Sequence, residues 1–319
     1  MFGGLEKLDN KIIITVIGND RPGIVAEISR ILYKHKANIL KTRASALGNL
    51  FVMVMLADLS SADVSASWIK EEVKEAGVKL GLGVSVEKAE GFGKKKKLVA
   101  FDMDGTLIEN ETIDELARAA GVYEEVKRIT EAAMEGKISF KKALAKRVKL
   151  LRGLPISEVE NIKRRLRLSP GAEDLIGELK KAGFVTAIIT GGFDVFANHV
   201  AEILGIDYVY ANKLKVKDGR LTGEFEGVIV SPEDKLKALM EISAKEGIPL
   251  EECVAIGDGA NDIRLLEGSG LGIGYKPKEA LKKHVDGVVK RLDLKTVLAL
   301  LGVSQASNDV ARRLKSEAS

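Results

Sequence analysis

This sequence lacks disulfides, membrane spans and a strong excess of one charge. Its single cysteine, Cys253, has no partner for an intramolecular disulfide, so a reducing compartment such as the cytoplasm is expected. No uninterrupted apolar stretch is long enough to cross a bilayer, and no basic segment followed by an apolar one opens the chain. Neither a membrane partner nor secretion is therefore expected.

The charges are nearly balanced. Lys and Arg number 50 against 46 Asp and Glu, a net charge of +4, which argues against a nucleic-acid partner. The local basic cluster at 94–97 follows a glycine-rich turn and precedes an apolar run, so we interpret 91–97 as a linker. Three scattered histidines, His35, His199 and His284, lack the spacing of a metal site.

The composition is that of a globular protein. A chain of 319 residues that is 45% hydrophobic and 30% charged has room for about two domains. The expected domains are 1–90 and 98–303, followed by a tail at 304–319 to which no function is assigned.

Residues 11–90 have the pattern of a small α+β unit. The order of elements is βαββαβ, which is typical of a ferredoxin-like fold with two helices on one face of an antiparallel sheet. Ser61 is the expected N-cap of the second helix. The expected strands are 12–17, 39–46, 50–56 and 78–86, and the expected helices are 24–34 and 62–76.

Beyond the linker, strands alternate with helices, which predicts an α/β fold with a doubly wound, mostly parallel sheet. The expected strands are 98–101, 184–190, 207–210, 253–257 and 271–275. The segment of about 112–168 shows only amphipathic helices and is too long for an ordinary loop, so we interpret it as a helical cap inserted over the strand ends.

Asp102 and Asp104 follow the apolar run 98–101, at the place where such a sheet carries its chemistry. A carboxylate at the strand end can attack phosphorus, and a second one two residues later can handle a proton. The alternative interpretation is an acidic turn closed by Gly105.

Three further pieces fall at expected strand ends or helix starts. In chain order they are Thr190-Gly191-Gly192, which offers a hydroxyl and backbone N–H groups to an anion, Lys235, and the oxygen-rich run Asp258-Gly259-Ala260-Asn261-Asp262. The alternative for the first piece is a tight turn, for Lys235 a surface lysine, and for the last piece a capped helix start.

In order and placement, the four pieces resemble the haloacid dehalogenase superfamily, which implies a Rossmann-type core. The resemblance implies that Asp102 is the nucleophile and that Asp104 is the acid and base of the phosphatase members. True dehalogenases lack an aspartate at the second place, so Asp104 favours a phosphatase. Thr190 replaces the serine that is usual in the closest branch. The implied magnesium ligands are Asp102, the main-chain carbonyl of Asp104 and Asp258, with Asp262 at the metal or its water; the implied phosphate ligands are Thr190, Gly191, Gly192, Lys235 and Asn261.

The cap resembles that of the phosphoserine phosphatase branch. Glu111 would complement the ammonium of phosphoserine and Arg147 its carboxylate, while Met134 and Phe140 would close an apolar lid. The alternative is that Met134 and Phe140 pack in the cap core and that the two charges are solvated.

The N-terminal unit carries Asn19-Asp20-Arg21-Pro22-Gly23-Ile24 after its first strand and Ala37-Asn38-Ile39 at its second. In these segments it resembles an ACT domain, a module that binds amino acids, commonly between two copies. This resemblance implies a site for serine or another amino acid and a homodimer. A purely dimerising or stabilising role is the alternative. The implied ligand residues are Asp20, Gly23, Ile24 and Asn38.

The resemblances together imply Mg²⁺-dependent hydrolysis of O-phospho-L-serine through an aspartyl phosphate, the last step of serine biosynthesis. Three alternatives stay open at this point: transfer of the phosphoryl group to another hydroxyl such as that of homoserine, hydrolysis of a different small phosphate ester, and an amino-acid-responsive binding protein whose phosphatase half is vestigial.

Overall fold

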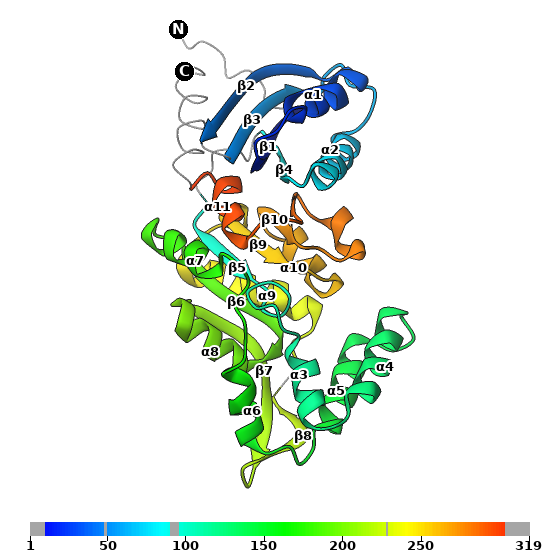
Figure 1. The fold of residues 1–319 in the computed structure, drawn as a ribbon, viewed down its shortest axis with the longest axis vertical. Coiled ribbons are helices and arrows are strands. Elements are labelled where there is room, and N and C mark those ends of the chain that lie inside the picture. The colour runs from blue at the N-terminus through cyan, green and yellow to red at the C-terminus, as the bar shows by residue number, and fades with distance from the viewer. Residues whose placement is uncertain (1–9, 48–49, 90–95, 228, 304–319) are drawn as a thin grey trace.

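The computed structural model describes residues 10–47, 50–89, 96–227 and 229–303. The expected tail and most of the expected linker lie outside these ranges. Within them, no helix is long and apolar enough to cross a membrane. One 11-stranded sheet runs along the molecule in the order β2-β3-β1-β4-β11-β10-β9-β5-β6-β7-β8. The N-terminal domain, the α/β domain and the cap follow one another along its length (Figure 1).

The N-terminal domain has the expected βαββαβ order. Its central strand β1 pairs antiparallel with β3 and β4, and β3 pairs with β2. Every second residue of β1, Ile12, Ile14 and Val16, packs with buried residues of both helices. The elements are β1 (Lys11–Asn19), α1 (Ile24–Lys34), β2 (Asn38–Leu47), β3 (Leu50–Asp58), α2 (Ala66–Leu80) and β4 (Gly83–Lys88).

Helix α2 begins and ends four residues later than predicted from the sequence. Ser65 is the N-cap in place of Ser61, and its side chain accepts a hydrogen bond from the Trp68 N–H at 3.4 Å. The helix continues through Leu80 until Gly81, whose left-handed conformation (φ 70°) ends it. Residues 78–80, expected to open the last strand, therefore belong to the helix.

In the α/β domain, all five expected strands form a parallel sheet. Alternate residues of β5 face opposite sides: Val99 and Phe101 pack with α7 and α8, and Leu98 and Ala100 with α9 and α10. Cys253 is fully buried in the second of these clusters, as expected for a packing role. The strands are β5 (Leu98–Phe101), β6 (Val185–Phe193), β7 (Tyr208–Lys217), β9 (Cys253–Gly257) and β10 (Leu271–Tyr275), and the helices are α7 (Ala172–Lys181), α8 (Asp194–Leu204), α9 (Pro232–Glu246), η1 (Leu250–Glu252), η2 (Ala260–Asp262), α10 (Ile263–Glu267), η3 (Glu279–His284), η4 (Leu294–Thr296) and α11 (Val297–Leu300).

The cap is helical, as predicted, but a hairpin from the α/β domain packs beside it. Strand β8 (Arg220–Glu226) pairs antiparallel with the far end of β7 and contacts α5. The turn is Asp218-Gly219, with both residues at positive φ, a sequence signal for a two-residue hairpin that our prediction missed. The cap helices are α3 (Thr112–Ala119), α4 (Tyr123–Met134), α5 (Phe140–Leu150) and α6 (Ile156–Lys163).

A short strand that the sequence analysis missed, β11 (Gly287–Val289), joins the two domains into one sheet. It pairs parallel with β10 and antiparallel with β4 of the N-terminal domain. A Cβ at Gly287 would lie 2.8 Å from the Val84 carbonyl oxygen, so the close approach requires glycine. The junction is therefore an ordered sheet contact rather than a loose tether.

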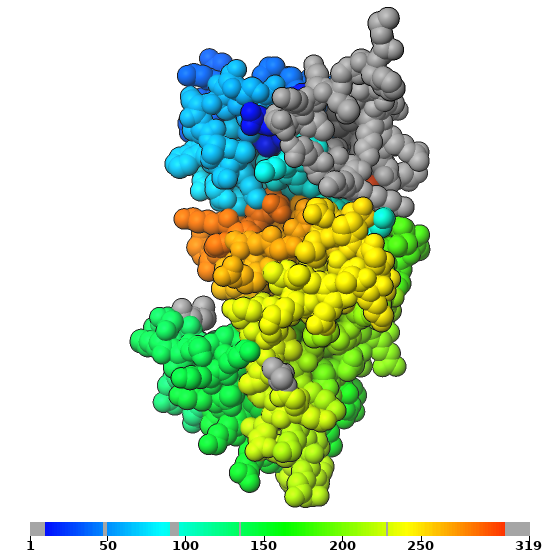
Figure 2. Space-filling model, turned by 180° about the vertical axis from the view of Figure 1, so that it is seen from behind, coloured from blue at the N-terminus to red at the C-terminus, as the bar shows by residue number. Residues whose placement is uncertain are grey.

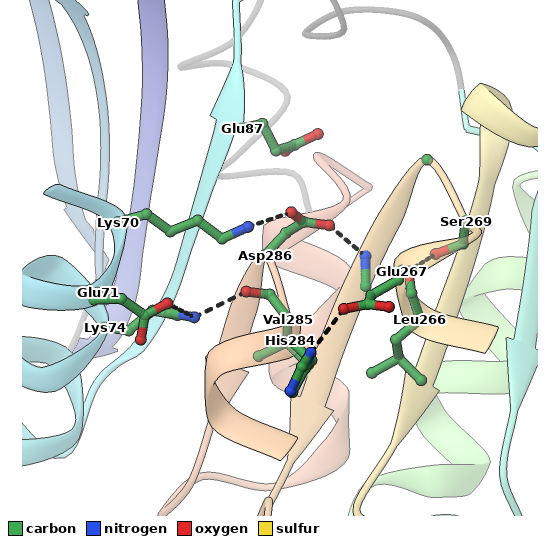
Figure 3. Close-up of polar contacts among 12 residues, drawn as sticks. Lys70, Glu71, Lys74, Glu87, Leu266, Glu267, Ser269, His284, Val285 and Asp286 are labelled. Atoms are coloured by element: carbon green, nitrogen blue, oxygen red, sulfur yellow. Dashed lines mark hydrogen bonds and ion pairs between the residues drawn. The ribbon is translucent and has the colours of Figure 1, made fainter. Parts of the chain in front are cut away.

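Charged side chains of α2 reinforce this junction (Figure 3). The buried Lys74 ammonium donates to the carbonyl oxygens of Lys282, at 2.6 Å, and Val285, at 2.9 Å. Lys70 forms an ion pair of 2.6 Å with Asp286, whose other oxygen accepts the Gly272 N–H at 2.7 Å. Because buried charges are stable only when paired, these contacts fix how the two domains dock.

Glu87, at the same junction, makes stability depend on pH. Burial raises its pKa from 4.5 to about 7; Asp286 adds to the rise, and Lys96 and Lys70 oppose it. Between pH 4.5 and about 7, Glu87 holds a proton in the folded state and has lost it in the unfolded state. The contribution of Glu87 to stability therefore falls as pH rises from about 5 to 8. We expect Glu87→Gln to gain about 3 kcal/mol over the parent across this range in urea unfolding. The exposed Glu75→Gln serves as control; an equal pH slope for Glu87→Gln and the parent would contradict this reasoning.

Candidate active site

The carboxyl ends of β5, β6 and β9 meet around Asp102. Its carboxylate is only 3% exposed, and its N–H donates to the Ile256 carbonyl oxygen at 2.8 Å, so the sheet pairing runs up to the side chain itself. The turn that follows comes so close to β9 that a Cβ at Gly105 would lie 2.9 Å from Asp258 Oδ2. Gly105, at φ 70°, thus brings Asp102 and Asp258 into one site.

Lys235 is buried at the start of α9 rather than on the surface. Ser231 and Asp234 form a capping box that fixes where the helix begins. The Lys235 ammonium, 1% exposed, reaches Asp102 Oδ1 at 2.9 Å and Asp262 Oδ1 at 2.6 Å. Burial lowers the pKa of Lys235, but these two carboxylates outweigh it and hold the pKa above its usual value, so the ammonium stays charged.

Asp102, Asp258 and Asp262 form a compact acidic group. Each offers a carboxylate oxygen, and these oxygens all lie within 4.8 Å of one another. Burial, followed by the charge of Asp102, raises the pKa of Asp258 to about 6 and that of Asp262 to about 7. The two lysines in contact with this group, Lys235 and Lys278, do not neutralise three carboxylates, so the oxygen-rich site fits a hard metal cation.

Asp262 is also a structural support of this group. Its second oxygen accepts the N–H groups of Asp258, at 3.2 Å, and Gly259, at 3.1 Å. A Cβ at Gly257 would lie 2.5 Å from that oxygen. Asp262 therefore holds both the β9 loop and Lys235 in position.

Asp104 faces the first turn of cap helix α3. Its Oδ1 accepts the Thr112 N–H at 2.7 Å and its Oδ2 the Thr112 hydroxyl at 3.2 Å. Burial, then the charges of Glu111 and Asp102, raise the pKa of Asp104 well above its ordinary value. A carboxyl that keeps its proton to higher pH is suited to donate that proton to a leaving group.

The Thr190-Gly191-Gly192 segment lies between Asp104 and the cap. Thr190 is 1% exposed, and its hydroxyl accepts the Gly192 N–H at 3.0 Å. A Cβ at Gly192 would meet Asp104 Oδ2 at 2.6 Å, and one at Gly191 would lie 3.1 Å from the Phe140 ring. The absence of side chains therefore lets the segment approach both the carboxyl group and the lid residue.

These residues surround a cavity of about 520 Å³ between the α/β domain and the cap. The space-filling view shows a notch where the cap stands away from the body of the α/β domain (Figure 2). Lys235 and Asp262 are buried behind the wall, and the Met134 side chain lies outside the described atoms. The expected site residues that line the cavity are Asp102, Asp104, Glu111, Phe140, Arg147, Thr190, Gly191, Gly192, Asp258 and Asn261.

The cap supplies one carboxylate and one guanidinium to this cavity. Glu111 is the N-cap residue of α3, and Arg147 lies in the last turn of α5. Burial lowers the pKa of Arg147, although Asp114 and Glu111 oppose the shift. Its Nε is buried with no hydrogen-bond partner among the described residues, and Nη1 donates only a long bond of 3.4 Å to Thr130. Arg147 therefore has unused donors for an anion.

Sequence analysis missed several polar residues of the site, among them Thr112, whose N–H and hydroxyl bind Asp104. Lys278, just after β10, forms ion pairs with Asp258 at 2.9 Å and Glu111 at 3.2 Å, and so links the cap to the acidic group. Asn212 donates to the Gly191 carbonyl oxygen at 2.8 Å and accepts the Val230 N–H at 2.7 Å. Asp114 lines the cavity near Arg147. Lys278 and Asn212 both carried a usable signal, because each comes shortly after a predicted strand, 271–275 and 207–210.

The residues expected to bind an amino acid lie at opposite ends of the N-terminal sheet, because Asp20 follows the end of β1, whereas Asn38 pairs with Asp58, the partner of Lys11 at the start of β1. Asp20 is exposed in the loop after β1, and Asn38 is exposed at the start of β2. Gly23, at φ 94°, is the N-cap of α1, and Ile24 is buried in the domain core. Ile24 therefore presents its backbone rather than its side chain at the end of the sheet that carries Asp20.

Comparison with known proteins covers both domains. The model of the haloacid dehalogenase-like hydrolase family matches residues 99–267, and that of the ACT domain matches residues 10–87. A phosphoserine phosphatase of Archaeoglobus fulgidus is 41% identical over 301 residues, 94% of this chain and 87% of its own. Two solved structures, a substrate-bound phosphoserine phosphatase complex and a phospho-aspartyl intermediate analogue of phosphoserine phosphatase, are each 50% identical with a TM-score of 0.62, over 65% of this chain and 99% of theirs.

Proposed function

The chain belongs to the haloacid dehalogenase-like hydrolases and carries an ACT domain, and we propose that it hydrolyses O-phospho-L-serine to L-serine and phosphate. The observation that carries this proposal is one cavity that joins phosphoryl-transfer groups, Asp102 and Asp104, to the cap charges Glu111 and Arg147. The relative in Archaeoglobus fulgidus supports it, because its alignment covers 94% of this chain, and so both domains, and that relative is named a phosphoserine phosphatase.

In the first step, Asp102 attacks phosphorus and the bond to the serine oxygen breaks. Asp104 donates its proton to that leaving oxygen, for which its raised pKa is suited. In the second step, Asp104 takes a proton from water, the water oxygen attacks phosphorus, and the Asp102 carboxylate leaves with release of inorganic phosphate. The solved phospho-aspartyl analogue of a relative supports this sequence.

Lys235, Thr190, Asn261 and the N–H groups at Gly191 and Gly192 are proposed to bind the phosphate oxygens. Donors fixed before the reaction are worth about 3 kcal/mol of barrier each. The Lys235 ammonium is held by two carboxylates, so it needs no rearrangement to face the developing charge.

The acidic group fits Mg²⁺, since its donors are all oxygen and its carboxylates outnumber the one buried lysine. We propose Asp102, Asp258 and the main-chain carbonyl of Asp104 as metal ligands. Asp262, which belongs to the same acidic group, is proposed to contact the metal or its water. Bound Mg²⁺ supplies charge neutralisation between the nucleophile and the phosphate dianion.

The head group of phosphoserine matches the cap. Its ammonium would bind Glu111, and its carboxylate would bind the unused donors of Arg147. Phe140, packed against Gly191, would help to exclude water from the acyl phosphate. This charge complement favours phosphoserine over esters that lack either group.

The test is initial-rate phosphate release with Mg²⁺ from phosphoserine, phosphothreonine, glycerol phosphate and p-nitrophenyl phosphate, with and without homoserine. We expect the highest kcat/KM for phosphoserine and no phosphohomoserine. Phosphohomoserine as the main product would replace hydrolysis by transfer, and an equal rate on all four esters would contradict the substrate assignment.

Glu111→Gln is expected to lower kcat/KM for phosphoserine about 10- to 100-fold more than for p-nitrophenyl phosphate. A hydrogen bond between charged groups is worth about 1.5–3 kcal/mol, and only phosphoserine has the ammonium that forms it. The ratio of the two substrates is the readout, because Glu111 also contacts Lys278 and affects both reactions. The exposed Glu109→Gln is the matched control, and equal losses on both substrates would remove Glu111 from ammonium recognition.

The N-terminal domain is proposed to bind serine or another amino acid, in a homodimer, through Asp20 and Gly23 at one end of its sheet and Asn38 at the other. In this role L-serine, the product of the proposed reaction, would regulate serine biosynthesis by binding to the N-terminal domain. Gel filtration of the full chain with and without L-serine tests the dimer.

A further inference from the structure

A second cavity, of about 440 Å³, lies between the N-terminal domain and the α/β domain. Its volume is in the range of small-molecule sites. Helix α2 and strand β4 form one wall, and the other comes from α10, the loop after it, the end of η3 and Asp286 just before β11 (Figure 3). Both walls are rich in charge, with Lys70, Glu87 and Lys88 on the first and Glu267, His284 and Asp286 on the second.

Most of these charges already have partners within the structure. Lys70 pairs with Asp286 at 2.6 Å, and His284 Nδ1 lies 2.7 Å from Glu267. Ser269, on the same wall, donates its hydroxyl to the Leu266 carbonyl oxygen at 2.8 Å. These contacts build a fixed frame around the cavity.

Two of these charges, Lys88 and Glu87, are exceptions, and Glu87 is the more buried of the two. Its side chain is 11% exposed, and its nearest cation, Lys96, is 3.9 Å away with its ammonium donating to the carbonyl oxygens of Glu251 and Gly270. No donor among the described residues gives the Glu87 carboxyl a hydrogen bond, and the close-up shows it standing apart from the bonded network (Figure 3). A carboxyl left buried without a donor costs free energy that a cationic ligand would recover.

We propose that this cavity binds a small molecule with both an ammonium and a carboxylate, of the amino-acid class, as a site separate from the active site. Glu87 accepts the hydrogen bonds of the ammonium. The exposed Lys88, for which the described part of the chain provides no ion pair, faces the carboxylate. The site also differs from the positions of Asp20 and of Asn38, because it needs both domains to be complete.

The same junction offers a physical route to the active site. Lys74, on α2, binds the carbonyl oxygens of Lys282 and Val285 at the end of η3. At the start of η3, the Lys278 N–H donates to the Asp258 carbonyl oxygen at 2.8 Å, and its ammonium binds Asp258 and Glu111. A ligand that binds across the junction therefore acts on a short helix that holds a metal-site carboxylate and the cap.

The test is isothermal titration of the full chain with L-serine, glycine, L-alanine and L-glutamate, with no phosphate ester present. At least one should bind saturably, with Kd raised tenfold or more in Glu87→Gln and in Lys88→Met. Binding should be unchanged in Glu75→Gln, which removes an exposed carboxylate of α2 outside the cavity. Lys88 is exposed, so its variant tests the site independently of the stability gain expected for Glu87→Gln.

Two further variants separate binding in this cavity from binding at the active site or at the N-terminal domain. Glu111→Gln impairs the active site, and Asn38→Ala alters the surface of the N-terminal domain; binding that survives in both supports the interdomain cavity. Binding that is lost in Glu111→Gln or in Asn38→Ala, or that survives in Glu87→Gln and Lys88→Met at parent affinity, overturns it, as does the absence of binding by all four amino acids. Phosphate release is measured separately, so failure of the cavity leaves the proposed function intact.

Discussion

Asp102→Asn is expected to lower kcat for phosphate release by about four orders of magnitude or more, since an amide does not form the aspartyl phosphate. The substitution keeps the size of the side chain, and its oxygen still accepts a hydrogen bond from Lys235. It also removes one of three crowded carboxylates, whose charge contributes to the raised pKa values of Asp258 and Asp262. The fold is therefore expected to persist while turnover is lost.

The nucleophile is identified by labelling rather than by rate alone. Acid quenching after mixing with ³²P-phosphoserine should leave label on the parent protein and none on Asp102→Asn. The exposed Asp174→Asn is the control with unchanged label and turnover. Label on Asp102→Asn at the parent level would place the covalent step on another residue.

The site could be predicted from the sequence wherever a chemical group follows a buried strand. Parallel strands such as β5 and β9 have continuous apolar runs, so their ends are visible, and the ends meet at one edge of the sheet. Asp102 and Asp258 were found in this way. Thr190 was found at the end of the predicted strand 184–190, although β6 in the structure continues past Thr190 to Phe193.

What the sequence did not reveal depends on contacts between distant segments. Asn212 follows a predicted strand, but its role is not visible until Gly191 and Val230 lie on either side of it. Strand β11 has three residues, too few for a periodic pattern, and it forms because β4 of the other domain pairs with it. Likewise, the sequence around Lys235 does not show that this lysine is buried, because its burial depends on Asp102 and Asp262, which come from other parts of the chain.

The second large effect is expected for Lys235→Met, which should destabilise the protein by about 3–5 kcal/mol in urea unfolding at neutral pH without added metal. Methionine fills a similar volume, so packing is largely retained. The loss arises because Asp102 and Asp262, 3% and 0% exposed, remain buried without their cation. Lys237→Met, on the exposed side of the same helix, is the matched control and should change stability by less than about 1 kcal/mol.

A double variant separates the charge imbalance from the loss of phosphate binding. Lys235→Met combined with Asp262→Asn removes one negative charge together with the positive one, and we expect most of the lost stability to return. Turnover should not return, because the phosphate oxygens still lack the ammonium. Recovery of both properties would make Lys235 a purely structural residue, whereas recovery of neither would mean that its contacts to Asp102, rather than to Asp262, hold the site together. The expected split, stability without activity, assigns Lys235 to the reacting phosphate when Asp262→Asn alone keeps turnover, because Asp262 itself lies in the acidic group proposed to hold the metal.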